Sequence, residues 1–393
     1  DVDRPAAARR GDAVRPLSIV AALQYYLPHR TGYTLHVQRV AEALVARGHR
    51  VTVLTARHRR DLARREVVAG VDVLRLDAPL RLSRGALMPG YPLAAWRLAR
   101  DADVVWANSP MAELGLWAAI ARRTGTRFVV THHGDLHLPD GAMNRLIERM
   151  TFAGWRYAAR RADALVAYSD DYATHSRWLA PWRDRIVVVA PPIAIPKPDP
   201  AAVAVLRREL APEGGPLVVF AGRFAQEKRP DLLLDGIAPL RARHPHLRVV
   251  FAGEERLGYE DTRTELEPRV SAAKDAVRFL GLVDDAQTLA NVYAACDVLA
   301  LPSQTECFGL VQVEAMLCGT PVVASDIPGA RVPVQATGAG RLFESGSVDG
   351  LVDAIGDVLA HRDAYRPDLA RVARAFDLAR TVDAYESVLG GER

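Results

Sequence analysis

The sequence predicts an α/β protein with two Rossmann-like domains, each built on a doubly wound parallel sheet, facing each other across a cleft. Short, almost continuously apolar segments alternate with helical stretches, one proline-rich segment interrupts this alternation, and the alternation then starts again. Strands that are apolar throughout are typical of parallel sheets covered by helices on both faces. A chain of 393 residues is also long enough for about two domains.

The first domain is expected to span residues 17–190. It contains a helical run at 35–46 and seven strand-like segments: LSIVAAL (17–23), VTVLT (51–55), VDVLRL (71–76), DVVWAN (103–108), RFVVTHH (127–133), ALVAYS (164–169) and RIVVVA (185–190). Residues 1–16 contain arginines but lack the apolar core of a signal peptide, so a loose tail is expected there.

Residues 191–200, PPIAIPKPDP, hold five prolines in ten positions, which neither a central strand nor a helix accommodates, and are expected to link the domains. The second domain is expected at 201–370, and 371–393 is expected to form a helix that returns to the first domain. The strand-like segments of the second domain are LVVFAG (217–222), LRVVFAG (247–253), VRFLGLV (277–283), DVLALPS (297–303) and TPVVAS (320–325).

Charge is distributed unevenly along the chain. Residues 1–190 carry 29 Lys and Arg against 18 Asp and Glu, a net charge of +11, whereas residues 191–393 carry 22 against 29, a net charge of −7. A basic half suggests an anionic partner, and aromatic residues among the arginines at 96–100 and 149–161 favour an anionic membrane surface over nucleic acid. Dispersed arginines on solvated helix faces remain the alternative.

Composition also bounds the location of the protein. No run of 18 or more apolar residues exists, so no segment is expected to span a membrane. The three cysteines, Cys296, Cys307 and Cys318, form no closed disulfide framework and fit free thiols in a reducing compartment. We therefore expect a cytoplasmic protein, either free or peripheral at the inner membrane face.

Two glutamates mark the first candidate site. Glu306 follows the predicted strand at 297–303 and precedes a helix, whose N-terminus favours an anion. Glu314 lies eight residues later, which on a helix is about 12 Å along the axis and about 80° around it. The two carboxylates could therefore accept hydrogen bonds from opposite ends of an elongated ligand such as a nucleotide sugar. The alternative is that Glu314 pairs inside the core and Glu306 lies near a helix cap.

Two cations strengthen this interpretation. Arg223 and Lys228 lie in the loop after the predicted strand at 217–222. Because the carboxyl ends of parallel strands meet at one edge of a sheet, these side chains are expected near Glu306, where they could bind a diphosphate. A solvated charged turn is the alternative for this loop.

Residues 302–323, PSQTECFGLVQVEAMLCGTPVV, resemble the retaining glycosyltransferases of family 4, which have the GT-B fold and a Glu-x7-Glu motif. Glu306 and Glu314 match that motif, and Arg223 and Lys228 match the diphosphate-binding pair of the family. Residues 31–55 are similar to its N-terminal loop, helix and second strand. The resemblance covers residues 17–390.

The resemblance implies a hexosyltransferase that uses a nucleotide diphosphate sugar, UDP-linked or GDP-linked, with a glycan, lipid-linked or small-molecule acceptor and no metal or other cofactor. It implies catalytic roles for His133, Glu306, Arg223 and Lys228. It implies donor contacts for Gly32, Val283, Asp285, Phe308, Gly309, Leu310, Val311 and Glu314.

Several alternatives stay open at these positions. Gly32 could be a plain turn glycine, His133 a histidine at a strand end, and Asp285 the N-cap of a helix. Thr31 stands where the family often has a second glycine, and residues 325–334 lack the Gly-Gly and following Glu of many relatives. The alternative functions are a nucleotide-sugar epimerase, a sugar phosphorylase or a non-catalytic nucleotide-sugar-binding subunit.

A metal site is disfavoured at the end of the segment RFVVTHH. His133, Asp135 and His137 have a spacing that suggests metal ligands, but Gly134 interrupts the regular structure that would align them. No cysteine lies near a histidine with ligand spacing.

Overall fold

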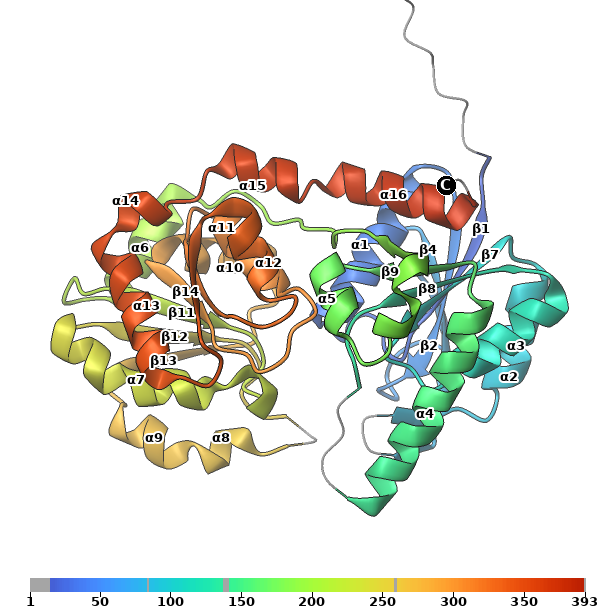
Figure 1. Ribbon diagram of the computed structural model, residues 1–393, viewed down its shortest axis with the longest axis horizontal. Coiled ribbons are helices and arrows are strands. Elements are labelled where there is room, and N and C mark those ends of the chain that lie inside the picture. Colours follow the sequence, from blue (N-terminus) through green and yellow to red (C-terminus); the bar gives the residue numbers. More distant parts are fainter. Residues whose placement is uncertain (1–14, 83–84, 137–140, 258–259, 392–393) are drawn as a thin grey trace, which may run out of the picture.

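The computed structural model describes residues 15–82, 85–136, 141–257 and 260–391. They form two α/β domains side by side, the first mainly blue to green and the second mainly yellow to red in Figure 1. The expected pair of doubly wound parallel sheets is confirmed. Of the expected N-terminal tail, residues 1–14 lie outside the described residues.

The first domain contains an eight-stranded sheet. In spatial order its strands are β10 (Ile186–Val188), β9 (Ala164–Ala167), β8 (Arg127–His132), β7 (Val104–Ser109), β1 (Ser18–Ala22), β2 (Arg50–Arg57), β4 (Val71–Asp77) and β3 (Arg65–Val68). All neighbouring pairs are parallel except β3 and β4. The chain winds outward from β1 in both directions, so the strand order reverses between β1 and β7.

Helices cover both faces of this sheet. One face packs against α1 (Gly32–Ala46) and α16 (Leu378–Gly390). The other packs against α2 (Tyr91–Arg100), α3 (Leu114–Thr124), α4 (Ala142–Arg161) and α5 (Asp170–His175). A separate hairpin, β5 (Leu80–Leu82) and β6 (Gly85–Leu87), and the 3-10 helix η1 (Ala180–Arg185) complete the domain.

The second domain repeats the same winding with six parallel strands. In spatial order they are β13 (Val277–Gly281), β12 (Arg248–Ala252), β11 (Leu217–Ala221), β14 (Val298–Leu301), β15 (Val322–Ser325) and β16 (Gly340–Phe343). The order reverses between β11 and β14. One face is covered by α6 (Pro200–Leu210), α10 (Ala286–Ala295), α11 (Leu310–Leu317), α12 (Arg331–Thr337) and α15 (Leu369–Ala375).

The remaining helices of this domain lie on the opposite face or at its edge. The opposite face is covered by α7 (Pro230–Arg243), α9 (Glu267–Ala272) and α13 (Val348–Ala360). Shorter elements are η2 (Gln226–Lys228), α8 (Thr262–Glu265) and α14 (Arg362–Tyr365).

The chain crosses between the domains twice, first through the proline-rich segment and then between α15 and α16, which run along the top of Figure 1. Phe376 still belongs to the core of the second domain, so the second crossing begins a few residues later than residue 371. On the first domain, Tyr385 of α16 hydrogen bonds through its hydroxyl to Nε2 of His36 at 2.8 Å.

Apolar runs explain which strands the sequence predicts. β7 and β11 are buried at every position, whereas β3 alternates between exposed and half-buried residues. β3 therefore lacks a continuous apolar run, and neither it nor β16 was among the expected strands. Among the described residues no helix combines the length and the apolarity needed to cross a membrane, and the three cysteines are free thiols.

Candidate functional site

The reversal points of the two sheets identify where a ligand is expected, since ligands of doubly wound sheets bind where the strand order reverses. In the second domain, Arg223 and Lys228 follow β11, and Glu306 and Gly309 follow β14, the two strands that flank this point. In the first domain, the loop from β1 leads to Gly32, the first residue of α1.

Lys228 and Glu306 form an ion pair, with Nζ of the lysine donating to Oε1 of the glutamate. The Ser303 hydroxyl donates to the same oxygen at 3.2 Å. The side chains of Lys228 and Glu306 are only 20% and 10% exposed. Burial favours the neutral amine of Lys228, but the Glu306 and Glu227 carboxylates outweigh it and raise the pKa of the lysine. The lysine is therefore a fixed positive charge beside the second sheet.

Arg223 lies in the same group of charges. Its Nη2 donates to Oε1 of Glu227 at 2.8 Å, and Glu227 also acts on Lys228. The pKa of His29 in the first domain is lowered by burial and by Arg223. The cations after β11 therefore lie close to the loop between β1 and α1, across the boundary between the domains.

Glu314 has a different environment from Glu306. It is 6% exposed, and its Oε1 accepts a hydrogen bond at 3.1 Å from Nη2 of Arg39 on α1 of the first domain. Arg39 also donates to the backbone oxygens of Pro192 and Ala194 in the linker, at 3.0 and 2.9 Å. The second glutamate of the motif is thus paired across the domain boundary.

The N-terminus of α11 faces the N-terminus of α1. A Cβ added to Gly32 would lie 3.3 Å from Cδ1 of Leu310, the first residue of α11. Gly309, the N-cap of α11, has a φ of 76°, which favours glycine. Two helix N-termini with their positive dipole ends therefore meet near Lys228, an arrangement that attracts an anion.

The other predicted residues at the start of α11 and just before it differ in accessibility. Leu310 and Val311 are half-buried, whereas Phe308 is buried, with its ring centroid 6.3 Å from that of Tyr168 and 5.4 Å from that of Phe376. The Phe308 side chain therefore supports the loop from inside the core instead of presenting a surface to a ligand.

His133 is buried with both ring nitrogens hydrogen bonded. Nε2 lies 2.9 Å from Oδ1 of Asn108, and the Tyr168 hydroxyl contacts Nδ1. Burial is the main cause that holds the pKa of His133 well below the usual value, and the neighbouring His36 and His132 lower it more. The ring is therefore neutral. Contact with a ligand through either nitrogen requires exchange of one of these bonds.

The loop after β13 holds Val283, which is half-buried, and Asp285, which is exposed. Asp285 is the N-cap of α10 and accepts from the backbone N–H of Thr288 at 2.7 Å, so the capping alternative is confirmed for this residue. Arg30 of the first domain donates to the Asp284 backbone oxygen at 2.8 Å. This loop therefore also meets the first domain beside Gly32.

Another contact across the domain boundary comes from residues 325–334, where the Gly-Gly and Glu pattern is missing. Arg331 on α12 forms a hydrogen bond from Nη2 to Oδ1 of Asp171 on α5 at 2.7 Å, and its Nε contacts both carboxylate oxygens at 3.1 Å. The backbone N–H of Gly329 donates to Oδ2 of Asp171 at 2.9 Å. Sequence reasoning missed Arg39, Arg331 and Asp171, because no local pattern signals a partner in the other domain.

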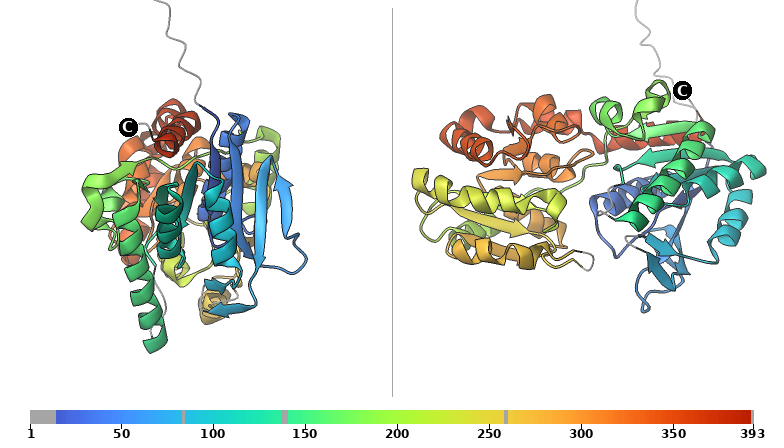
Figure 2. Two further views of the ribbon diagram at one scale, coloured as in Figure 1. Left: turned by 90° about the vertical axis from the view of Figure 1, so that its right-hand side faces the viewer. Right: turned by 60° about the horizontal axis from the view of Figure 1, so that its bottom comes forward.

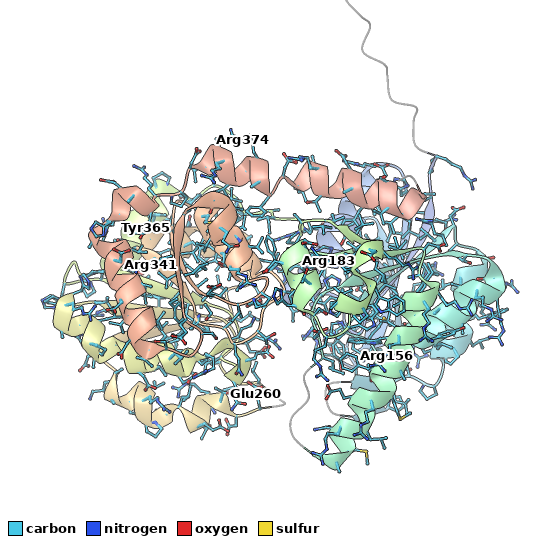
Figure 3. The ribbon with its side chains drawn as sticks, in the orientation of Figure 1. Arg156, Arg183, Glu260, Arg341, Tyr365 and Arg374 are labelled. Carbon is cyan, nitrogen blue, oxygen red and sulfur yellow. The ribbon has the colours of Figure 1, made fainter. Side chains whose placement is uncertain are left out.

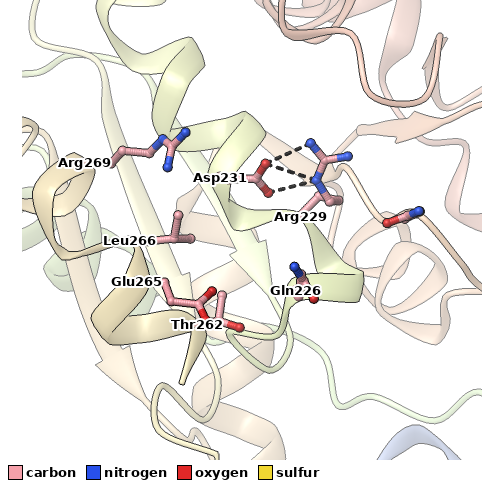
Figure 4. A pocket seen from close by; sticks show the side chains of 8 residues that line it. Gln226, Arg229, Asp231, Thr262, Glu265, Leu266 and Arg269 are labelled. Atoms are coloured by element: carbon pink, nitrogen blue, oxygen red, sulfur yellow. Dashed lines mark hydrogen bonds and ion pairs between the residues drawn. The ribbon is translucent and has the colours of Figure 1, made fainter. Parts of the chain in front are cut away.

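A pocket of about 300 Å³ opens beside η2, and Figure 4 shows the Arg229 and Asp231 ion pair at its wall. None of the predicted site residues lines it. His137, the third residue of the spacing for which a metal site was disfavoured, lies outside the described residues. Within the described part of the chain no group of three or more His, Cys, Asp or Glu side chains could hold a metal ion.

Known proteins resemble the chain along its length. Residues 31–192 match the family described as "Glycosyl transferase 4-like domain", and residues 205–375 match "Glycosyl transferases group 1". The D-inositol 3-phosphate glycosyltransferase of Actinosynnema mirum is 30% identical over 390 residues, which cover 92% of this chain and 92% of that protein. The chain belongs to glycosyltransferase family 4. The predicted family is therefore confirmed.

Other relatives of this family 4 glycosyltransferase match over shorter regions. The D-inositol 3-phosphate glycosyltransferase of Saccharomonospora viridis is 36% identical over 250 residues, 60% of this chain and 57% of that protein. The chain spans about half the length of several such curated relatives. Anabaena HepE in complex with UDP and glucose superposes with a TM-score of 0.77 at 22% identity, covering 95% of this chain and 100% of that one. This likeness confirms the GT-B fold.

Proposed function

We propose that this family 4 glycosyltransferase moves a hexose from a nucleotide diphosphate sugar to an acceptor with retention of anomeric configuration. The observation that carries the proposal is the half-buried Lys228 and Glu306 pair, which lies at the reversal point of the second sheet beside the N-terminus of α11. Gly32, at the N-terminus of α1, approaches Leu310 from the other domain. A diphosphate between these groups meets positive charge from both domains.

The donor is proposed to lie along the line from Glu306 to Glu314. Glu306 accepts hydrogen bonds from sugar hydroxyls, and Glu314 accepts them from ribose hydroxyls. Because Arg39 already uses Oε1 of Glu314, the ribose shares this carboxylate with the arginine or displaces it. The nucleobase is proposed to lie against the backbone of Val283, with Asp285 serving mainly as a helix cap.

The proposed reaction breaks the bond between the anomeric carbon and the donor phosphate oxygen, and forms a bond from that carbon to an acceptor oxygen on the same face. The acceptor proton moves to the leaving phosphate. Negative charge grows on this phosphate, where Lys228, Arg223 and the N–H groups near Gly309–Val311 stabilise it. Loss of one such donor typically raises a barrier by about 3 to 4 kcal/mol.

The neutral ring of His133 is proposed to contact the donor sugar after exchange of its bond to Asn108 or Tyr168. Nε2, which faces the amide oxygen of Asn108, is the nitrogen that carries the proton if the Tyr168 hydroxyl donates to Nδ1. Donation from Nε2–H to a sugar hydroxyl or phosphate oxygen then needs no change in the charge of the ring.

We propose that these protein groups neutralise the diphosphate without a divalent ion, so activity should persist in EDTA. The donor is proposed to be UDP-linked or GDP-linked. UDP-glucose is the first candidate because the HepE complex contains UDP and glucose. The acceptor is proposed to be a glycan, a lipid-linked sugar or a small molecule, and the name of the relatives makes an inositol phosphate the first to test.

The test has two stages. Thermal melting with UDP, GDP and ADP identifies the nucleotide, because a ligand of the folded state raises the melting temperature. Transfer is then followed with the matching donors and a panel of acceptors, and the anomeric configuration of the product is read by NMR. An inverted product contradicts the proposal.

Lys228→Ala and Glu306→Ala are each expected to lower turnover by about 100-fold or more. Arg243→Ala is the matched control, because it breaks an exposed ion pair to Asp353 on the same domain, at 2.7 Å. Normal turnover of both site variants would remove the site assignment.

A further inference from the structure

Helix α4 of the first domain has a buried carboxyl-terminal half. Trp155 is buried, and its Nε1 donates to the backbone oxygen of Met111 at 2.7 Å. Gly154 lies so close to α3 that a Cβ added to Gly115 would be 3.1 Å from the Gly154 Cα. This half is therefore fixed to α3, and it holds the rest of the helix in a defined position.

The amino-terminal half of α4 extends away from the domain. Figure 1 shows it projecting below the sheet, and the left view of Figure 2 shows the same projection from the side. Met143, Leu146 and Met150 are 68%, 52% and 68% exposed. Their spacing of three and four residues places them on one face of the helix. Three large apolar side chains within eight residues form an exposed apolar row.

A row of arginines runs beside the apolar row. At about 100° per residue, the four exposed arginines of this row fall within about 60° of one another, and their centre lies about 100° from the centre of the apolar row. Figure 3 labels one of them, Arg156, which is exposed on α4. In the described residues none of the four has an acidic side chain within ion-pair distance. The row comprises Arg145, Arg149, Arg156 and Arg160.

The acidic residue of α4 does not neutralise this row. Glu148 is the single acidic residue in the helix, and it pairs with Arg177 at 2.8 Å. The arginine row therefore keeps its full positive charge beside the exposed apolar row.

We propose that α4 docks the protein on an anionic lipid surface. Met143, Leu146 and Met150 enter the boundary between headgroups and acyl chains, and the arginine row contacts lipid phosphates. A helix with an apolar face beside a basic face is suited to this position, and flexible methionines adapt to a fluid surface. This inference does not depend on the proposed transfer reaction.

Two other occupants fit the same surface less well. A nucleic acid would use the arginines but would leave the apolar row in water. A second copy of the chain would cover the apolar row but would bring two arginine rows of like charge together. An anionic membrane satisfies both rows at once.

The experiment uses the full chain, without donor or acceptor, in cosedimentation with vesicles. The protein is expected to bind vesicles of phosphatidylcholine mixed with phosphatidylglycerol and to remain in the supernatant with phosphatidylcholine alone. Binding should be strong at about 0.01 M salt, where the Debye length is about 30 Å, and should fall steeply toward 1 M, where it is about 3 Å.

Two variants separate the two rows. Each arginine near an anionic surface contributes about fivefold in partition. The triple variant Arg145→Gln, Arg149→Gln and Arg156→Gln is therefore expected to bind anionic vesicles at least tenfold more weakly. The double variant Leu146→Asp and Met150→Asp is expected to lose binding by a similar factor. Both should keep the melting temperature of the wild type, because the replaced side chains are exposed.

Matched controls change exposed residues elsewhere by the same chemistry. They are Leu93→Asp on α2 and the triple variant Arg208→Gln, Arg366→Gln and Arg374→Gln in the second domain. Both controls are expected to bind like the wild type.

Failure of the wild type to bind anionic vesicles at low salt would overturn the proposal, as would equal loss of binding in the controls. Sedimentation velocity without lipid tests the second copy: a dimer that Leu146→Asp with Met150→Asp converts to a monomer would also overturn it. A transferase that is active on a soluble acceptor but binds no vesicle would retain the proposed function and lose only this inference.

Discussion

Replacing Lys228 by methionine tests whether its pair with Glu306 is a coupled unit. The change leaves the Glu306 carboxylate, which is 10% exposed, with a neutral donor from Ser303 at 3.2 Å. Breaking a buried ion pair from one side typically costs 3 to 5 kcal/mol, and the 20% exposure of Lys228 places the expected loss of unfolding free energy at the lower end, about 3 kcal/mol. Adding Glu306→Gln removes the unpaired charge, so the double variant should lie within about 1 kcal/mol of the wild type.

The assay is urea unfolding of the wild type, the two single variants and the double variant, followed by far-UV circular dichroism. The double-mutant cycle is expected to give a coupling free energy of at least about 2 kcal/mol. The matched cycle on Arg243 and Asp353, whose side chains are 54% and 62% exposed, should give less than about 0.5 kcal/mol. Additive losses in the Lys228 and Glu306 cycle would refute the reasoning.

Turnover separates stability from catalysis in the same set of proteins. The double variant of Lys228 and Glu306 keeps the fold but lacks a charge that stabilises the leaving phosphate. Its turnover is therefore expected to fall at least about 100-fold although its stability is restored. A stable double variant with normal turnover would contradict the proposed role of the pair.

Three further changes test other parts of the structure. Gly309→Ala places a side chain on a residue with a φ of 76° and should lower the free energy of unfolding by about 1 to 2 kcal/mol, as measured by urea unfolding. An unchanged free energy of unfolding would show that this backbone conformation does not require glycine. Burial raises the pKa of Asp171, but the hydrogen bonds from Arg331 and from the backbone N–H of Gly329 lower it by more. The net shift of this pKa is therefore downward. The stability it contributes is present above the unfolded pKa of about 3.9 and is lost as pH falls through the folded value. Asp171→Asn should therefore flatten the loss of melting temperature below about pH 4, and an unchanged profile would contradict this. Arg39→Gln should raise the affinity for the nucleoside diphosphate several-fold in calorimetry, because Glu314 is then free to bind the ribose. Glu314→Gln should lower this affinity. A lower affinity in Arg39→Gln would refute the idea that Arg39 and the ribose compete for Glu314.

Strand prediction succeeded where the residues form a largely apolar run, as in the partly exposed β10 and β13 as well as in buried strands, and failed where no such run exists. β7 and β11 read as apolar runs because helices cover both of their faces. β3, with the sequence REVV, is an antiparallel edge strand whose exposure alternates, so its residues give no such run. β16, with the sequence GRLF, begins with glycine and contains an arginine. Both belong to sheet edges, but the opposite edge strands, β10 and β13, keep apolar runs and were predicted, so the missing apolar run accounts for the two failures.

In the candidate site, the sequence predicted a contact within one domain but not a contact between the domains. Lys228 and Glu306 were predicted as neighbours because they follow strands that adjoin at the reversal point of one sheet. The Arg39 contact to Glu314 joins residues 275 positions apart and depends on how the two domains meet. No single-sequence pattern contains that orientation, so the partner of Glu314 was not predicted.

The return of the chain to the first domain has a consequence for biosynthesis. Val382, Tyr385, Val388 and Leu389 of α16 fill the core between α1 and the first sheet. A ribosome makes α16 only after the whole second domain, although domains generally fold as units in the order of their synthesis. The first half therefore emerges with one apolar face covered by α1 alone, and it completes its interior only after the other half has been translated.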